Sequence, residues 1–305
     1  MTTPPGRELK NHQARSATTI HGWPSMLFGL PFFAVGVGAL VVWRVAPEQV
    51  EGPAPLLLWF GVVFGLVGLS LIVHGIKGLR LRARVAERKR AHPTEPWKWD
   101  HLWDPYGARD DGARRVRRGF FGAAFLVVFM LPFNYVGFVL QGVPGRWFWV
   151  GIVGLFDLIA VMVVGYAVYL LMRYLKYGTS AVSFDAFPFR LGERASLRFL
   201  GPGRSELLEP VQVTLRAVEE RYETRGSGKN RSQQVVCYET YADTQAIDDV
   251  RARWEGRRGL QVAFDVPRDA AGTRLSERPP RYWELEITAD VPGVDYRAVF
   301  LLPVY

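Results

Sequence analysis

Cysteine is almost absent from this chain of 305 residues, in which Cys237 is the single one. One cysteine excludes an internal disulfide and any metal site built from several thiolates. The sequence also lacks a serine nucleophile elbow, a complete phosphate-binding loop and a motif of paired carboxylates. It therefore predicts a protein that is not an enzyme and that uses no metal and no cofactor.

Charge is nearly missing from four long stretches of the chain. They cover residues 26–45, 54–76, 119–140 and 147–172. A helix of about 20 residues rises about 30 Å, which is the thickness of the hydrocarbon core of a membrane. The sequence thus predicts four transmembrane helices in two hairpins, residues 25–78 and 118–177. The first stretch is expected to remain as an anchor, because no cleavage site of small residues follows it.

Positive charge is concentrated between the two hairpins, in the Trp-containing segment 79–117. The short connection 46–53 has no Lys or Arg. Since Lys and Arg beside membrane helices are retained on the cytoplasmic side, this asymmetry predicts that both termini are cytoplasmic. The net charge of +9 then reflects orientation and attraction to anionic membrane lipids, which argues against nucleic acid as a partner.

The two ends of the chain differ in their sequence pattern. Residues 1–24 mix Pro, Thr, Gln and Arg without periodicity, which is typical of a disordered cytoplasmic tail. From residue 178 onward apolar residues alternate with polar ones, as in Val211, Val213 and Leu215. Half-buried antiparallel strands have this period, and about seven of them predict a cytoplasmic β-sandwich over residues 178–305. The expected fold is an α+β membrane protein, with four transmembrane helices followed by this sandwich.

Three motifs resemble a family of uncharacterised four-helix bacterial membrane proteins. They are Pro96-Trp97-Lys98-Trp99 followed by Asp100 and Trp103, the run RYLKYGTS at residues 173–180, and the run GSGKNR at residues 226–231. The resemblance covers most of the chain. It implies a multi-pass protein of the bacterial inner membrane, and it brings no established activity and no catalytic residue.

A second resemblance concerns the predicted sandwich. The run VAFDVP at residues 262–267 and, after Ser276, the run YWELEI at residues 282–287 are similar to the strand pair of arrestin-like sandwiches. That resemblance implies a module that binds proteins rather than one that performs chemistry.

Asp157 is an acidic residue inside the fourth predicted helix, ten residues after Trp147. A rise of 1.5 Å per residue places it about 15 Å into the membrane, near the bilayer centre. A carboxylate at that depth faces a cavity or a partner. Two interpretations stay open. Asp157 is either a site for a proton or cation, or a protonated or hydrogen-bonded acid that holds the bundle together through Asn134, Tyr135 or a carbonyl freed by Pro132.

Trp97, Trp99 and Trp103 lie within the basic segment. One interpretation places the segment in the lipid headgroup layer, with the rings toward the membrane and the cations toward phosphate. The other packs the rings under the sandwich. His92 and His101 are in the same segment, but their spacing matches no common metal site.

The tip of one predicted hairpin, residues 225–231, is basic and rich in glycine. Its Arg225, Lys229 and Arg231, together with the edge strands of the sandwich, are expected to contact a partner protein. The predicted function is to present the sandwich for protein–protein interaction or assembly, including homo-oligomer formation. The alternative is a small channel, transporter or membrane-perturbing effector in which Asp157 lines the path.

Overall fold

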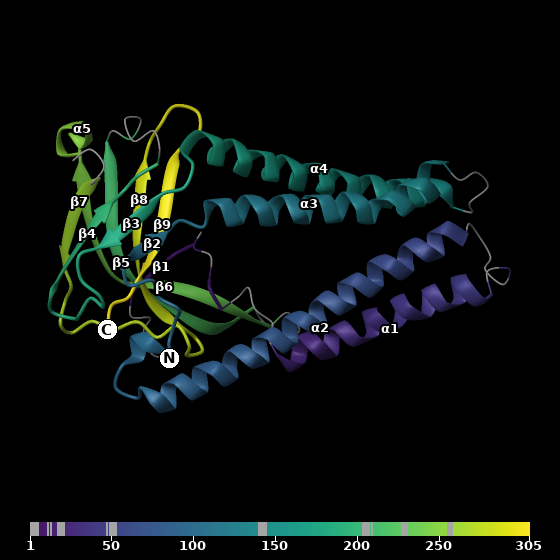
Figure 1. Cartoon of the computed structure of the whole chain (residues 1–305). Helices are drawn as coiled ribbons and strands as arrows, with labels where there is room; N and C mark the ends of the chain where they lie inside the picture. Colours follow the sequence, from purple (N-terminus) through teal and green to yellow (C-terminus); the bar gives the residue numbers. More distant parts are fainter. Residues whose placement is uncertain are drawn as a thin grey trace. The chain divides into compact units, whose positions relative to one another are not determined.

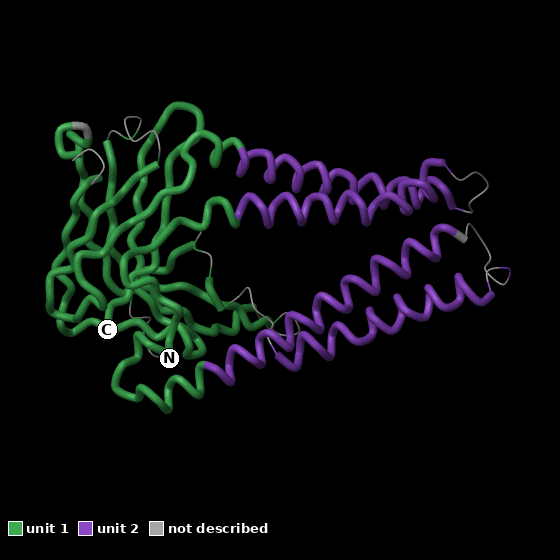
Figure 2. Tube along the Cα trace, viewed as in Figure 1, with its two compact units in different colours: residues 1–19, 85–114, 172–305 green, residues 20–84, 115–171 purple. Residues whose placement is uncertain are grey.

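The computed structural model describes residues 6–10, 12, 14–16, 22–46, 48, 54–139, 145–202, 208, 210–226, 231–254 and 259–305. The chain divides into two compact units (Figure 2). Unit 1 contains residues 1–19, 85–114 and 172–305, and unit 2 contains residues 20–84 and 115–171. Each unit therefore combines segments that are far apart in the sequence.

Unit 2 consists mainly of four long helices (Figure 1). They are α1 (Trp23–Val45), α2 (Ala54–Ala91), α3 (Gly112–Asn134), which continues into a π-helical turn (Tyr135–Val139), and α4 (Arg146–Tyr177). All four are long and apolar enough to cross a membrane, which confirms the prediction of four such helices. α2 runs beyond the predicted span as far as Ala91, because the Arg, Lys, Leu and Ala residues that follow the span are good helix formers.

Glycines bring the backbones of α1 and α2 together inside unit 2. A Cβ atom on Gly36 would lie 2.2 Å from the backbone nitrogen of Gly65, so only glycine permits this approach. The two helical hairpins meet through aromatic rings, since Phe60 of α2 and Phe133 of α3 pack edge to face with centroids 5.6 Å apart. On α4, in contrast, a Cβ on Gly151 would meet nothing within 4 Å.

Unit 1 is built on two antiparallel sheets. The strands are β1 (Arg7–Glu8), β2 (Gly107–Arg109), β3 (Ala181–Phe184), β4 (Arg194–Phe199), β5 (Val211–Arg225), β6 (Ser232–Ile247), β7 (Leu260–Asp265), β8 (Arg281–Ala289) and β9 (Tyr296–Leu302), with one short helix, α5 (Val250–Arg253). The five-stranded sheet has the order β1-β6-β5-β8-β9, and the four-stranded sheet has the order β2-β3-β4-β7. The predicted antiparallel sheet region after the helices is confirmed in this form.

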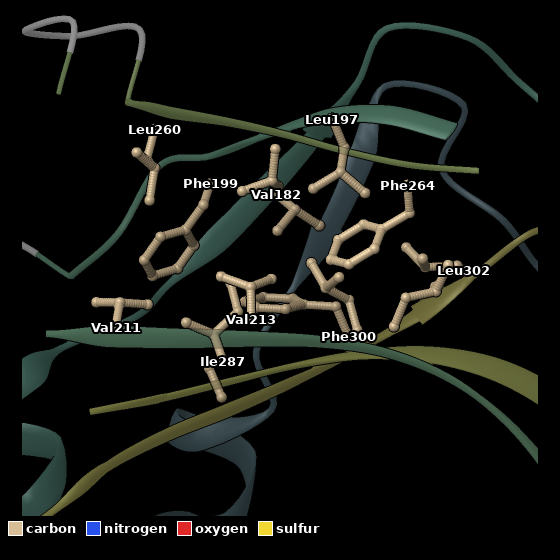
Figure 3. Packing of buried hydrophobic residues seen from close by; sticks show 14 of the residues in the cluster. Val182, Leu197, Phe199, Val211, Val213, Leu260, Phe264, Ile287, Phe300 and Leu302 are labelled. Carbon is tan, nitrogen blue, oxygen red and sulfur yellow. The ribbon is translucent and has the colours of Figure 1, made fainter. Parts of the chain in front are cut away.

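The main core lies between the two sheets (Figure 3). Phe199 of β4 and Phe264 of β7 face Val213 of β5, Ile287 of β8 and Phe300 of β9, and all of these side chains are buried. Alternation along each strand places one set of side chains on the inner face, where the apolar residues of both sheets interdigitate.

Two strands come from outside the C-terminal region. β1 lies in the stretch predicted to be a disordered tail, and β2 lies in the basic segment between the helical hairpins. With two and three residues they are too short to show a period, and each is ordered by pairing with a strand distant in sequence, β6 or β3. The sequence pattern indicated neither strand.

The last turn of α4, which belongs to unit 1, is hydrogen-bonded to the connection between β8 and β9. The Lys176 ammonium donates to the carbonyls of Pro292 at 2.9 Å and of Val294 at 3.0 Å. The Tyr177 hydroxyl also donates to the Val294 carbonyl, and its ring packs against Tyr296. The sandwich therefore holds the end of the helix that leads into it.

Candidate functional site

The hairpin of β5 and β6 has the longest strands of the sandwich. They contain 15 and 16 residues, whereas β4 and β7 of the opposite sheet contain six each. On β5 the main core ends at Ala217, and from Val218 the hairpin packs in a second apolar cluster with Cys237 and Tyr282. Figure 1 shows the hairpin continuing past the strands of the other sheet. Its distal half is thus separate from the main core.

Residues 6–10, 12 and 14–16, the described part of the N-terminal segment, lie against this distal half. β1 adds to the outer edge of β6 in antiparallel register. Beyond β1, the Leu9 N–H donates to the carbonyl of Cys237 at 2.9 Å. A Cβ on Gly6 would lie 2.0 Å from the carbonyl oxygen of Glu239, so glycine allows the segment to approach the edge. The edge of β6 accepts an added strand.

A buried carboxylate holds the other end of the segment. Glu220 of β5 is 0% exposed. Its Oε1 accepts the Arg15 N–H at 2.5 Å, and its Oε2 accepts the Ser16 N–H at 3.0 Å and also the Ser16 hydroxyl. The Tyr282 hydroxyl donates to Oε1 at 3.3 Å. Because a buried carboxylate requires donors in place of water, these contacts make Glu220 a clamp on two consecutive backbone amides.

Apolar and aromatic contacts lie between the strand and the clamp. Leu9 and Ala14 pack in the second cluster, with Ala14 buried. The His12 ring stacks on Tyr282 with centroids 6.3 Å apart, and its Nε2 lies 3.1 Å from the Tyr282 hydroxyl. The Arg15 guanidinium lies 4.9 Å from the centre of the same ring. Tyr282 is therefore the platform on which the middle of the segment rests.

An ion network lies beside His12 on the same face. Arg216 of β5 is bonded to Glu284 of β8 at 2.7 Å, and the His12 Nε2 is 3.5 Å from the same carboxylate. Burial, together with Arg216 and Arg15, lowers the pKa of His12 to about 4, so the ring is neutral at pH 7. Burial raises the pKa of Glu284. Burial and nearby carboxylates raise the pKa of Cys237 to about 12, which keeps this thiol protonated and unreactive.

The predicted partner-binding tip is only partly described by the structure. Arg225 donates to both carboxylate oxygens of Glu8, at 3.1 and 2.9 Å, and therefore binds the N-terminal segment. These hydrogen bonds lower the pKa of Glu8. Arg231 is exposed, and Lys229 lies outside the described residues. Whether these residues contact a partner protein stays a prediction.

The basic segment 79–117, called the Trp-rich segment below, is attached to the sandwich by a second carboxylate clamp. Asp100 is buried, and its two oxygens accept the N–H groups of Leu275 and Ser276, both at 2.7 Å. The hydroxyl of Tyr305 donates to Oδ2 at 3.2 Å. Here the carboxylate comes from the added segment and the amides come from the sandwich, which reverses the arrangement at Glu220.

The three tryptophans of this segment all contact protein groups. Trp103 donates its indole N–H to the Tyr305 hydroxyl at 2.9 Å, and the Trp97 ring packs edge to face against Tyr305. Trp99 donates to a backbone carbonyl, that of His92, at 3.0 Å and lies 4.7 Å from the Lys89 ammonium. All three rings are half-buried. Their role at a membrane surface stays a prediction.

The polar residues that the sequence predicts inside the membrane are found near the π-helical turn of unit 2. Asn134 donates to Asp157 Oδ1 at 2.9 Å and to the carbonyl of Met130 at 3.1 Å. Asp157 is half-buried, while Tyr135 is 43% exposed. The structure thus brings together two of the three residues, Asp157 of α4 and Asn134 of α3, in a hydrogen bond that links the two helices.

Apart from Arg225, the residues that hold the N-terminal segment were not among those predicted from the sequence. A signal for them exists on the outer face of the five-stranded sheet. Val218, Cys237 and Tyr282 occupy outward positions of β5, β6 and β8, and all three are buried. Since an uncovered sheet face carries polar residues at such positions, these residues indicate that another segment covers this face.

Comparisons with known proteins add little to this description. No family model matches the chain, and no curated protein matches it. Among solved structures it is similar to Spo0M, a sporulation control protein from Bacillus subtilis, with 10% sequence identity, 41% of this chain covered and a TM-score of 0.24. The match covers 48% of that chain. A TM-score this low carries no argument, and the four apolar helices with a β-sandwich-like region are the part of the two sequence resemblances that the structure confirms.

Proposed function

We propose that the chain is a multi-pass membrane protein whose β-sandwich binds another protein. In this proposal the protein lies in a bacterial inner membrane, with the termini and the sandwich on the cytoplasmic side, where anionic lipids attract the basic segment. The proposal requires no catalytic step. The protein that the sandwich binds can be a second copy of the same chain.

One observation carries the proposal, namely that the edge of β6 takes an added strand. β1 occupies this edge at Glu239 and Tyr238 only. In the part of the chain that the structure describes, β6 has no other neighbour on that side, so residues 232–236 and 241–247 keep an open edge. An open edge on a projecting hairpin is a recurrent means of recognising an extended partner, because backbone hydrogen bonds supply affinity.

A proline on the open edge tests the proposal. The Cys237 carbonyl faces outward to Leu9, and alternate residues share this direction, so the Gln233 N–H also faces the open edge. Gln233→Pro removes this outward donor without removing a bond to β5. After crosslinking in cells and purification in mild detergent, we expect partners with the full chain and with the control Gln233→Ala, and fewer partners with Gln233→Pro. Partners undiminished in a chain that ends at Tyr177 would contradict the proposal.

A second candidate function, passage of protons or cations through the helical bundle, rests on Asp157. Its contact with Asn134 is the specific observation in question. The same contact also explains the residue as a link between α3 and α4, so we place this function second. Ion flux into vesicles that contain Asp157→Asn distinguishes the two, because an interhelical hydrogen bond survives this change and a proton-binding carboxylate does not.

A further inference from the structure

We infer that the outer face of β5, β6 and β8 around Glu220 is a binding site for an extended peptide of a partner protein, and that the N-terminal segment occupies this site as a built-in competitor. The inference rests on the proposed function and deepens it by naming the site, the chemistry of the ligand and its regulation. The described residues of the N-terminal segment already occupy this site and show how a peptide binds there.

The contacts of the N-terminal segment define the chemistry of the ligand. It adds a short strand to the edge of β6, and it places a carboxylate beside that strand for the Arg225 guanidinium. An aliphatic side chain then enters the apolar cluster of Val218 and Tyr282. Finally, two consecutive backbone N–H groups donate to Glu220. The ligand is therefore an extended peptide with an acidic residue followed by an aliphatic one, and without proline at the position of Ser16.

Most of this recognition is directed at backbone groups, which makes the site transferable between peptides. Glu220 binds the amides of Arg15 and Ser16, and the edge of β6 binds the backbone of residues 7–9. Backbone donors are the same in any peptide except at proline. A partner segment needs few matching side chains to make the same hydrogen bonds.

The N-terminal segment is held weakly enough to be exchanged. Its strand has two residues, and the ion pair between Glu8 and Arg225 is exposed, with 37% and 42% of the side chains accessible. Exposed ion pairs add little and are screened by salt. The apolar anchors are limited to one leucine and one alanine, Leu9 and Ala14. When the segment leaves, Glu220 faces solvent on the outer side of the sheet, so its charge is hydrated and the empty site is accessible.

A change within the segment opens the site and leaves the site itself unchanged. Leu9→Asp places a charge in the apolar cluster and favours release of the segment, whereas Lys10→Asp changes an exposed neighbour. The probe is a fluorescent peptide with the sequence of residues 6–16, added to the full chain in detergent. We expect the Leu9→Asp chain to bind it about tenfold more tightly than the wild type and the Lys10→Asp chain, because an occupied site lowers apparent affinity.

Substitutions on the site and in the probe test the clamp. In the Leu9→Asp chain, Glu220→Gln is expected to reduce probe binding about tenfold, while Glu219→Gln, on the other face of β5, is expected to leave it unchanged. A probe with proline in place of Ser16 is also expected to bind more weakly. Equal binding by the Glu220→Gln chain would overturn the inference, as would no binding by both the Leu9→Asp chain and a chain that lacks residues 1–16.

Capture of crosslinked partners separates this inference from the proposed function. Partner capture that increases with Leu9→Asp and falls when Glu220→Gln is added supports both. Capture that depends on the open edge at Gln233 but not on Leu9 or Glu220 overturns the inference and supports the proposed function. A third outcome is that the probe binds in a way that depends on Glu220, but the chain captures no partner. This outcome contradicts the proposed function and the existence of a partner peptide, and it limits the site to the chain's own N-terminal segment.

Discussion

Two buried carboxylates attach two segments to the same sandwich, and they do so in opposite directions. Glu220 belongs to the sandwich and binds two amides of the N-terminal segment. Asp100 belongs to the Trp-rich segment and binds two amides of the sandwich, those of Leu275 and Ser276. Each carboxylate also accepts a hydrogen bond from a tyrosine hydroxyl, that of Tyr282 at Glu220 and that of Tyr305 at Asp100.

The groups around the two clamps differ, and this difference indicates which attachment is permanent. Asp100 is surrounded by large rings, since Trp97 and Trp103 both contact Tyr305. Beside Glu220 the apolar anchors are Leu9 and Ala14. Aromatic side chains bury far more surface than alanine does, and each good aromatic pair adds to this burial. We therefore expect the same hydrogen-bonding device to fix the Trp-rich segment and to leave the N-terminal segment releasable.

The largest predicted effect follows from removing the Asp100 carboxylate. Asp100→Ala leaves the amides of Leu275 and Ser276 without acceptors, and we expect the free energy of unfolding of the sandwich to fall by about 3 kcal/mol. Urea unfolding followed by tryptophan fluorescence in detergent measures this loss. The control is Asp104→Ala, which removes one exposed hydrogen bond to the Tyr106 amide and is expected to have a much smaller effect. Equal midpoints for the two variants would refute the permanent attachment.

Removing the charge at the other clamp is expected to release a segment without unfolding the sandwich. Glu220→Gln weakens the charge-assisted bonds to Arg15 and Ser16, and we expect the docking constant of the segment to fall by about tenfold or more. Cys237 reports this release, because it is buried, packs in the same cluster as Leu9 and is the single cysteine of the chain. Its rate of alkylation should rise by at least the same factor, because loss of the Glu220 charge also lowers the pKa of the thiol, while Glu219→Gln leaves the rate unchanged. A large drop in the urea midpoint instead of faster alkylation would remove the distinction between the clamps.

Sequence patterns predicted the parts of this structure that repeat over many residues. Charge-free runs of about 20 residues predicted the helices, and alternation along strands such as β5 and β9 predicted the sheets. The clamps have no such pattern, because Glu220 and Arg15 are 205 positions apart in the chain. The hydrogen bond between Asp157 and Asn134 belonged to one of the two interpretations that the sequence left open, since an acid near the predicted bilayer centre needs a partner. The strand at Arg7 and Glu8 is ordered by its contacts with β6 and not by its own composition.

Acidification is expected to weaken the N-terminal attachment. In the docked segment the pKa of His12 is about 4, and on release it returns to its ordinary value of 6.5. The released form therefore binds more protons between these values, so docking is complete above pH 6.5 and weakens as the pH falls toward 4. The groups that act on His12 come from three strands and from the segment itself: Tyr282, Glu284 and Glu286 from β8, Arg216 from β5, Arg297 from β9 and the neighbouring Arg15.

We expect the docking constant to fall by about tenfold between pH 7 and pH 5. Reaction of Cys237 with dithiodipyridine, which proceeds in acid, follows the release. The raised pKa of Glu284 means that this carboxylate is itself protonated more readily than usual and offers less charge to an imidazolium. His12→Gln keeps a hydrogen-bonding group without a titration in this range, and its Cys237 reactivity, divided by that of the unfolded chain at the same pH, should be independent of pH. The same pH dependence in this variant would assign the effect to another group.

The smallest predicted effect concerns the charged pair at the tip of the hairpin. Arg225 makes two hydrogen bonds to Glu8, but both side chains are exposed, so water competes for the charges. We expect Arg225→Ala to weaken docking about twofold at low salt, with the difference vanishing at high salt. Cys237 reactivity at two salt concentrations measures it, and Arg231→Ala, at an exposed position just before β6, is the matched control. If Arg225→Ala lowered the docking constant as much as Glu220→Gln, the segment would be held mainly by its charged end. The backbone clamp would then no longer explain why one attachment is releasable and the other permanent.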